Sequence, residues 1–151
     1  MRRLSRSKDQ AKICVPIVET NERKAIEAIE EANSLADLIE LRVDYLNEPE
    51  LASLMKNRKK PFIITNRRKE EGGRYRGDKE ERFRTLKEAI ELGAEYVDVE
   101  MRSERPFLQD LLGSKKKTRM ILSYHNFQET PSPKKLQRLC DRMNEMGADL
   151  V

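Results

Sequence analysis

The sequence contains no tryptophan, a single histidine, two cysteines and few aromatic residues. A core without tryptophan must be mainly aliphatic, and with 37% hydrophobic against 38% charged residues it must be small relative to a heavily charged surface. Cys14 and Cys140 lie far apart and lack the spacing of metal ligands, so we expect buried, reduced thiols and no metal site. Reduced thiols are typical of intracellular proteins, and we expect a cytoplasmic one.

Long hydrophobic runs are also absent. The first apolar stretch, residues 13–18, is interrupted by Pro16 and stopped by Glu19, and it is too short for a signal-peptide core or a membrane span. Residues 1–12 are basic and polar, and we expect them to form a disordered tail. Residues 13–151 are therefore expected to be one folded domain that does not insert into a membrane.

Charge of one sign is not in large excess, because 31 basic residues face 27 acidic ones for a net charge of +4. The basic runs at residues 2–8, 58–60 and 115–119 are separated from one another and lie beside predicted turns. A dedicated nucleic-acid-binding protein usually concentrates its basic residues in one stripe. The charge pattern therefore argues against a nucleic-acid partner.

Five short apolar runs alternate with stretches of helical periodicity, which predicts parallel strands joined by helices in an α/β fold. The predicted strands are residues 13–18, 38–44, 62–67, 96–101 and 120–126. Helical spacing of apolar residues is clearest over residues 25–32, 83–90 and 136–146. Asp78 with Glu81 resembles a capping box, Ser132 before Pro133 suits a helix start, and Gly93 and Gly147 suit helix ends.

A weak internal repeat marks the points where helices end and strands begin. Residues 35–39 (Leu-Ala-Asp-Leu-Ile), 93–97 (Gly-Ala-Glu-Tyr-Val) and 147–151 (Gly-Ala-Asp-Leu-Val) share one pattern. The third copy predicts that the chain reaches the beginning of a sixth strand.

Side-chain alternation along the strands distinguishes a barrel from an open sheet. Ile39, Leu41 and Val43 share one face of the second predicted strand, while the opposite face is polar. A doubly wound sheet is apolar on both faces, whereas a (βα)8 barrel can carry polar groups inside its C-terminal rim. We therefore predict a TIM-barrel type of fold, incomplete here with about five βα units and the start of strand six. A complete barrel needs about 250 residues, so we expect either a fragment of a longer chain or a partial barrel that covers its edges by association.

The inward polar residues suit an anionic, hydroxylated ligand. Arg42 and Arg67 can each present a guanidinium fork to a carboxylate or hydroxyl group, and Glu40 can accept a hydrogen bond from a hydroxyl. The alternative is a purely structural network of ion pairs inside the barrel. Buried ion pairs contribute little net stability, which favours the functional interpretation.

His125, the single histidine, lies on the polar side of the fifth predicted strand near its C-terminal end. Glu71, in the loop after the third strand, is expected on the same rim, and a nearby carboxylate can orient an imidazole for proton transfer. A lone histidine is more often structural than catalytic, so both interpretations stay open on this evidence. The glycine-rich loop at residues 70–77 matches no phosphate-binding fingerprint, and a flexible connection is the simpler interpretation.

Three ordered motifs make the chain resemble the type I 3-dehydroquinate dehydratases over nearly its whole length. They are Glu-Leu-Arg-Val-Asp at 40–44, Thr-Asn-Arg at 65–67 leading into Glu-Gly-Gly at 71–73, and Ser-Tyr-His-Asn-Phe at 123–127. The resemblance implies a (βα)8 barrel, commonly a homodimer, that converts 3-dehydroquinate to 3-dehydroshikimate in the shikimate pathway without metal or cofactor.

By the same resemblance, His125 is the general acid/base and Glu71 the glutamate beside it, while Glu40, Arg42 and Arg67 bind the substrate. The family works through an imine between a lysine and the substrate ketone. The resemblance puts this lysine at the start of the sixth strand, and the internal repeat independently puts the equivalent position one residue beyond Val151. We therefore expect the 151-residue chain to be inactive alone. The alternative is a non-catalytic partial barrel that binds a shikimate-like acid or self-associates.

Overall fold

The computed structural model describes residues 11–56 and 58–151, so most of the predicted N-terminal tail lies outside the described residues. The strands are β1 (Cys14–Ile17), β2 (Leu38–Arg42), β3 (Phe62–Thr65), β4 (Tyr96–Glu100) and β5 (Arg119–Ser123). The helices are α1 (Glu22–Leu35), α2 (Leu51–Lys56), α3 (Lys79–Glu91), α4 (Arg105–Ser114) and α5 (Pro133–Glu145). Two short 3-10 turns, η1 (Val43–Tyr45) and η2 (Lys69–Glu71), follow β2 and β3.

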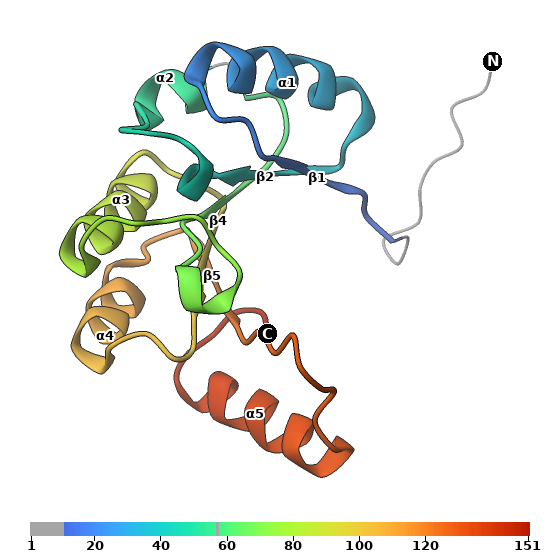
Figure 1. The fold of residues 1–151 in the computed structure, drawn as a ribbon, viewed down its shortest axis with the longest axis vertical. Helices are drawn as coiled ribbons and strands as arrows, with labels where there is room; N and C mark the ends of the chain where they lie inside the picture. Colours follow the sequence, from blue (N-terminus) through green and yellow to red (C-terminus); the bar gives the residue numbers. More distant parts are fainter. Residues whose placement is uncertain (1–10, 57) are drawn as a thin grey trace.

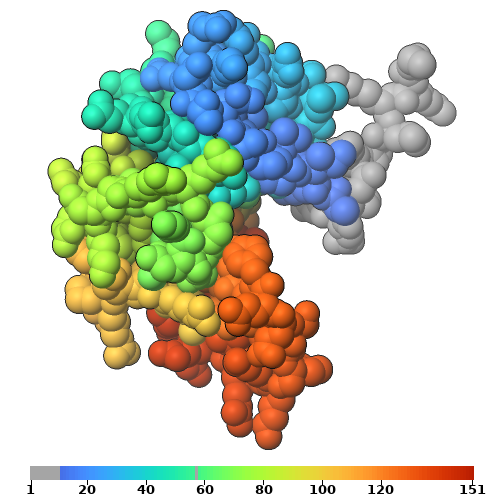
Figure 2. All heavy atoms as spheres, viewed as in Figure 1, coloured from blue at the N-terminus to red at the C-terminus, as the bar shows by residue number. Residues whose placement is uncertain are grey.

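All five strands are parallel and stand in the order β1-β2-β3-β4-β5. A doubly wound sheet reverses its strand order at a switch point, whereas a barrel adds strands in sequence around one axis. The helices lie along the outside of the curved sheet and form an arc (Figure 1). In the space-filling view, the blue N-terminal residues and the orange C-terminal residues occupy opposite ends of that arc (Figure 2). The predicted α/β fold of the incomplete-barrel type is confirmed.

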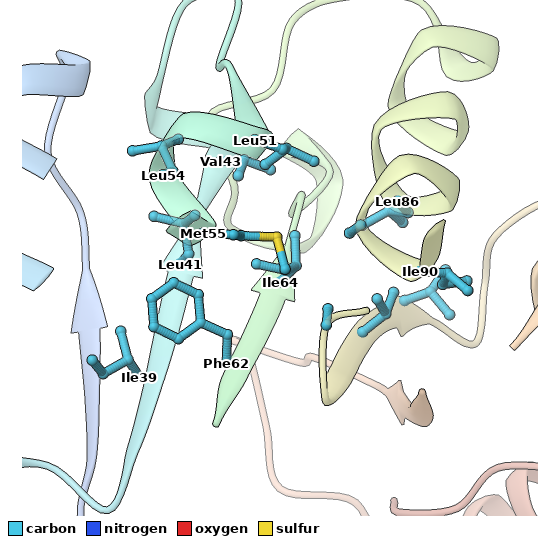
Figure 3. Packing of buried hydrophobic residues seen from close by; sticks show 14 of the residues in the cluster. Ile39, Leu41, Val43, Leu51, Leu54, Met55, Phe62, Ile64, Leu86 and Ile90 are labelled. Carbon is cyan, nitrogen blue, oxygen red and sulfur yellow. The ribbon is translucent and has the colours of Figure 1, made fainter. Parts of the chain in front are cut away.

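The hydrophobic core fills the space between the outer face of the sheet and the helices. Leu41 of β2 and Ile64 of β3 point toward α2, and Leu86 of α3, on the other side of Ile64, belongs to the same cluster (Figure 3). These three side chains are fully buried. The core is mainly aliphatic, as the absence of tryptophan requires. The opposite face of the sheet carries polar residues such as Glu40 and Asp98 together with the apolar Ile63 and Ile121.

The strands start where the sequence predicts but end earlier. β2 ends at Arg42, because Val43–Tyr45 turns into η1, so the predicted extension of this strand to Asp44 is wrong. β3 ends at Thr65 and β5 at Ser123, which leaves Arg67 and His125 on the loops that follow these strands. Both residues therefore lie on βα loops at the C-terminal edge of the sheet.

The predicted helix starts and ends are found at the expected residues, and one of the two predicted N-caps is hydrogen-bonded. The side chain of Asp78 accepts a hydrogen bond from the backbone N–H of Glu81 and begins α3. Ser132 and Pro133 begin α5, although no hydrogen bond from the Ser132 side chain caps the helix. Gly93 and Gly147 follow α3 and α5 with φ of +76° and +96°, a conformation that glycine adopts without strain.

The internal repeat has a structural role that its sequence pattern did not reveal. Asp37 accepts a hydrogen bond from the N–H of Ile13, and Glu95 accepts one from the N–H of Phe62. Asp149 accepts one from the N–H of Met120 in the same way. Each acidic residue of the repeat therefore ties the start of its own strand to the start of the preceding one. Leu150 pairs in parallel with Ile121 of β5, so the beginning of a sixth strand is also present.

The expectation of two buried thiols is wrong. Cys14 is exposed and Cys140 is half-buried, and both are free. Cys14 alternates with buried Ile17 along β1 and lies on the polar face of the sheet, where no helix covers it. Within residues 11–56 and 58–151, no helix is long and apolar enough to cross a membrane.

Candidate active site at the C-terminal edge of the sheet

His125 and Glu71 form a direct pair that joins two loops. Oε2 of Glu71 lies 3.2 Å from Nδ1 of His125 and also accepts a hydrogen bond of 3.1 Å from the backbone N–H of His125. The Glu71 side chain is 1% exposed and that of His125 is 30% exposed. A buried carboxylate thus contacts Nδ1 of a partly exposed imidazole, and the second nitrogen, Nε2, makes no hydrogen bond to the described residues.

Local backbone geometry brings Glu71 to this position. The turn η2 ends at Gly72, whose φ of +84° reverses the chain directly after the glutamate. Gly73 then passes so close to the backbone of Arg67 that a side chain at this position would collide with the Arg67 carbonyl group. The two glycines of this motif are therefore required by the fold of the loop, and no phosphate-binding role is needed to explain them.

A row of polar groups crosses the inner face of the sheet below this pair. Thr65 donates a hydrogen bond of 2.7 Å to Glu40 at one end of the row. At the other end, Ser123 donates one of 2.7 Å to Asp98. The Arg67 guanidinium lies 2.9 Å from Asp98 and donates a hydrogen bond to Ser123, so it connects β3, β4 and β5.

A second network of buried side chains lies next to Arg67, whose guanidinium is 3.3 Å from the carboxylate of Glu100. Glu100 is 1% exposed, and its two oxygens accept hydrogen bonds from the backbone N–H of Arg68 and from Arg82 of α3. Arg82 is 4% exposed and also donates to the Asn66 carbonyl and to the Ser103 hydroxyl. Sequence reasoning did not select Asp98, Glu100 or Arg82 as site residues.

Arg42 is placed differently from the other predicted residues. Its guanidinium makes two hydrogen bonds of 2.8 Å with the carboxylate of Asp44, and this pairing raises the pKa of Arg42. It also lies over the ring of Tyr45, 5.1 Å from the centroid. The guanidinium of Arg42, which was expected to bind a ligand, is thus already hydrogen-bonded to the carboxylate of Asp44.

The structure therefore brings Glu71 and His125 into contact and links Arg67 to the same strand edge through Ser123. Glu40 lies at the far end of the row, and Arg42 is held by Asp44 on η1. This arrangement can move a proton at Nε2 of His125 and can hydrogen-bond hydroxyl groups along the row. Among the described residues, no group of three histidine, cysteine or acidic side chains is arranged to hold a metal ion.

One oxygen of the site has no hydrogen-bond partner among the described residues. Oε1 of Glu71 is buried and unpaired, while Oε2 carries both bonds to His125. An unpaired buried carboxylate oxygen is costly in a purely structural role, since it loses its hydration without compensation.

Comparison with known proteins gives one consistent result. Residues 13–151 match the profile of the family described as Type I 3-dehydroquinase. The chain is 40% identical over 139 residues to the 3-dehydroquinate dehydratase of Methanocaldococcus jannaschii, covering 89% of this chain and 62% of that protein. It is 38% identical over 150 residues to the chloroplastic bifunctional 3-dehydroquinate dehydratase/shikimate dehydrogenase of Arabidopsis thaliana, covering 95% of this chain and 25% of that protein.

The fold agrees with the sequence comparison. The crystal structure of type I 3-dehydroquinate dehydratase from Clostridium difficile superimposes with a TM-score of 0.84 at 31% identity. The superposition covers 91% of this chain and 60% of the other. The chain therefore spans about three fifths of the length of these single-function relatives.

Proposed function

The chain belongs to the type I 3-dehydroquinase family, and on this basis we propose that its site serves the dehydration of 3-dehydroquinate to 3-dehydroshikimate. The observation that carries the proposal is the pair formed by buried Glu71 and the only histidine of the chain, His125. The pair lies at the C-terminal edge of a parallel barrel sheet, the edge at which barrel enzymes place their chemistry.

In this proposal His125 is the general acid/base. Because Glu71 binds Nδ1, the proton of the substrate is transferred to Nε2. The imidazolium that forms is stabilised by the carboxylate on its other side, as in other carboxylate–histidine pairs. The same Nε2–H can then protonate the departing hydroxyl group, so one side chain serves both halves of the elimination.

The residues of the inner row bind the substrate hydroxyl groups. Glu40 has one oxygen bonded to Thr65 and can accept a further hydrogen bond with the other. Arg67 is oriented by Asp98 and Ser123 and can turn its remaining N–H groups toward a ligand. Arg42 and Arg67 are already paired with carboxylates of the protein, so neither of them is assigned to bind the carboxylate of the substrate. We propose that Arg42 shapes the rim through Asp44, next to the ligand.

The family reaction also requires an imine-forming lysine, which supplies the electron sink for proton removal. The sixth-strand position that the resemblance assigns to this lysine is not among residues 1–151. We propose that the polypeptide of residues 1–151, taken alone, binds 3-dehydroquinate without dehydrating it. A cytoplasmic location and self-association likewise stay predictions.

Two measurements on this polypeptide test the proposal. The product is a conjugated enone, so its ultraviolet absorbance reports turnover, and borohydride reduction traps any imine as a stable adduct. We expect neither signal. Titration with 3-dehydroquinate should shift the NMR resonances of His125 and of residues beside Glu40, and Glu40→Gln should weaken this binding. Glu27→Gln, on the exposed face of α1, is the matched control and should bind as the unmodified chain does.

Turnover, or a trapped adduct on any lysine of the chain, would overturn the assignment of the nucleophile to the sixth strand. Absence of any shift at millimolar ligand would overturn the binding site itself. A Glu27→Gln variant that binds as poorly as Glu40→Gln would show that the effect comes from net charge, since both changes remove one negative charge.

A further inference from the structure

The segment that carries His125 has no regular secondary structure of its own. It leaves β5 at Ser123 and reaches α5 at Pro133. Short loops of this kind hold a side chain accurately only where specific contacts fix them. The contacts of Tyr124, His125, Asn126 and Phe127 therefore decide how the imidazole is placed.

Two of these contacts are polar. The hydroxyl of Tyr124 accepts a hydrogen bond of 2.9 Å from Arg102, whose guanidinium also lies over the tyrosine ring. Asn126 accepts hydrogen bonds from the backbone N–H groups of Gln128 and Glu129 and so closes a turn after the histidine. The turn directs the chain back toward the loop that follows β3.

Phe127 makes two further contacts. Its ring is stacked with the ring of His125, with centroids 6.3 Å apart, and it also lies against Gly72. A Cβ built on Gly72 would lie 2.7 Å from the Cζ of Phe127 and 2.9 Å from a second ring carbon. The ring thus lies on the bare backbone of Gly72, the residue next to Glu71. Phe127 is nevertheless 76% exposed, so it contributes little to the core.

We propose that Phe127 and Gly72 form a latch that positions His125 against Glu71. Two neighbouring residues of the β3–α3 loop each contact one residue of the β5–α5 loop. Glu71 binds His125, and Gly72 contacts Phe127. With the His125–Glu71 pair alone, the β5–α5 loop could rotate about Glu71. The second contact, of Phe127 with Gly72, restricts this rotation. Phe127 and Gly72 are positioning residues, since their effect acts through His125.

The latch gives Gly72 a second requirement beyond its φ of +84°. Any side chain at this position would push the phenylalanine ring away. Gly93 offers a matched comparison, because its φ is +76° and the nearest atom to a Cβ built there is the flexible end of Arg58 at 3.8 Å. Alanine at Gly93 carries a similar backbone strain without a ring to displace.

Amide exchange of the 151-residue chain tests the latch without substrate. The backbone N–H of His125 is bonded to Glu71, and that of Met101 is bonded to Ser123 and reports the sheet. We expect Phe127→Ala and Gly72→Ala each to speed exchange at His125 about five- to tenfold, the order expected for one lost aromatic contact. Exchange at Met101 should not change. Adding Gly72→Ala to Phe127→Ala should speed exchange at His125 by less than Gly72→Ala does alone, because the ring is already absent and only the backbone strain at φ +84° remains.

Two control variants accompany these. Gly93→Ala should leave His125 unaffected, as should Leu35→Ala, which removes an apolar side chain that is 72% exposed. Nitrogen chemical shifts of the single histidine provide a second readout, because the bond to Glu71 keeps a proton on Nδ1. We expect Phe127→Ala and Gly72→Ala to reduce the population of this tautomer.

Unchanged exchange at His125 in both variants would overturn the latch. Equal acceleration at His125 and Met101 would also overturn it, because it would mean that the two residues act on global stability. The catalytic meaning of the latch rests on the proposed function, but the exchange measurement involves no substrate. A failure of the proposed function would therefore leave the exchange result intact, and the reverse also holds.

Discussion

Arg82 is a charged residue on α3 whose side chain is almost completely buried, and it makes three hydrogen bonds to groups behind the candidate site. Removing one member of a buried ion pair leaves the other charge without compensation. We expect Arg82→Met to lower the free energy of unfolding by about 3 kcal/mol, mainly through the buried carboxylate of Glu100. Urea denaturation followed by circular dichroism measures this change.

Lys87 of the same helix provides the control. It lies 2.8 Å from Asp110, but both side chains are largely exposed. Exposed pairs of this kind contribute less than about 1 kcal/mol, so Lys87→Met should change the free energy of unfolding little. Equal losses in the two variants would contradict the view that the buried network carries stability.

The residue scale also shows which parts of the site were predictable. The pairing of Glu71 with His125 could be anticipated, because both follow parallel strands whose C-terminal ends meet at one edge of the sheet. The pairing of the Arg42 guanidinium with Asp44 could not. Alternation puts the two residues on the same face of a strand, but nothing in the pattern showed that the chain turns at η1, where they form two hydrogen bonds. Arg82 did leave a signal: it lies four residues before Leu86 and eight before Ile90, on the buried face of α3.

At the scale of elements, the repeated acidic residues determine how strand starts are joined. Asp149 accepts a hydrogen bond of 2.8 Å from the N–H of Met120 and lies 3.0 Å from Lys115. The backbone hydrogen bond and the lysine lower the pKa of Asp149 below its ordinary value of 3.8. A group with a lowered pKa in the folded state stabilises it above the unfolded pKa and loses this effect as pH falls through the folded value.

We therefore expect residues 149–151 to detach from β5 as the pH falls below about 4, before the central strands are affected. Exchange of the Leu122 amide, which donates to the carbonyl of Leu150, measures this detachment. Asp149→Asn should produce faster exchange at Leu122 already at neutral pH. The variant Asp110→Asn, which changes an exposed acid on α4, should leave Leu122 exchange as it is, and loss of protection there would refute the role of Asp149.

The same repeat explains why strand starts could be predicted while strand ends could not. Its acidic residue recurs at a fixed place just before a strand, so the pattern is visible in the sequence although each contact joins residues 24 to 33 positions apart. Strand ends are set by turns that follow no repeated pattern, such as η1, where Arg42 pairs with Asp44 only two residues further on. Helical periodicity located α1, α3 and α5. The count of five βα units also implied α2 and α4, but these helices have only 6 and 10 residues and their positions were not predicted.

At the scale of the whole molecule, the curved sheet has two ends. Among the described residues β1 pairs only with β2, and residue 150 makes the last contact at the other end, with β5. Apolar side chains gather at both ends: Ile13 is 53% exposed and Val18 is 44% exposed beside β1, and Val151 is 52% exposed opposite. Unpaired strand edges with apolar flanks favour pairing with another chain.

We expect the 151-residue chain to form dimers or larger assemblies at micromolar concentration through these ends. Sedimentation velocity over a range of concentrations measures the distribution of species. Ile13→Lys should shift it toward the monomer, because a lysine beside an edge strand would lose hydration on association. Gln109→Lys, at an exposed position of α4, adds the same charge to an outer helix, is the control and should leave the distribution unchanged. A monodisperse monomer that unfolds cooperatively would show instead that the chain protects its own edges, and the association prediction would be wrong.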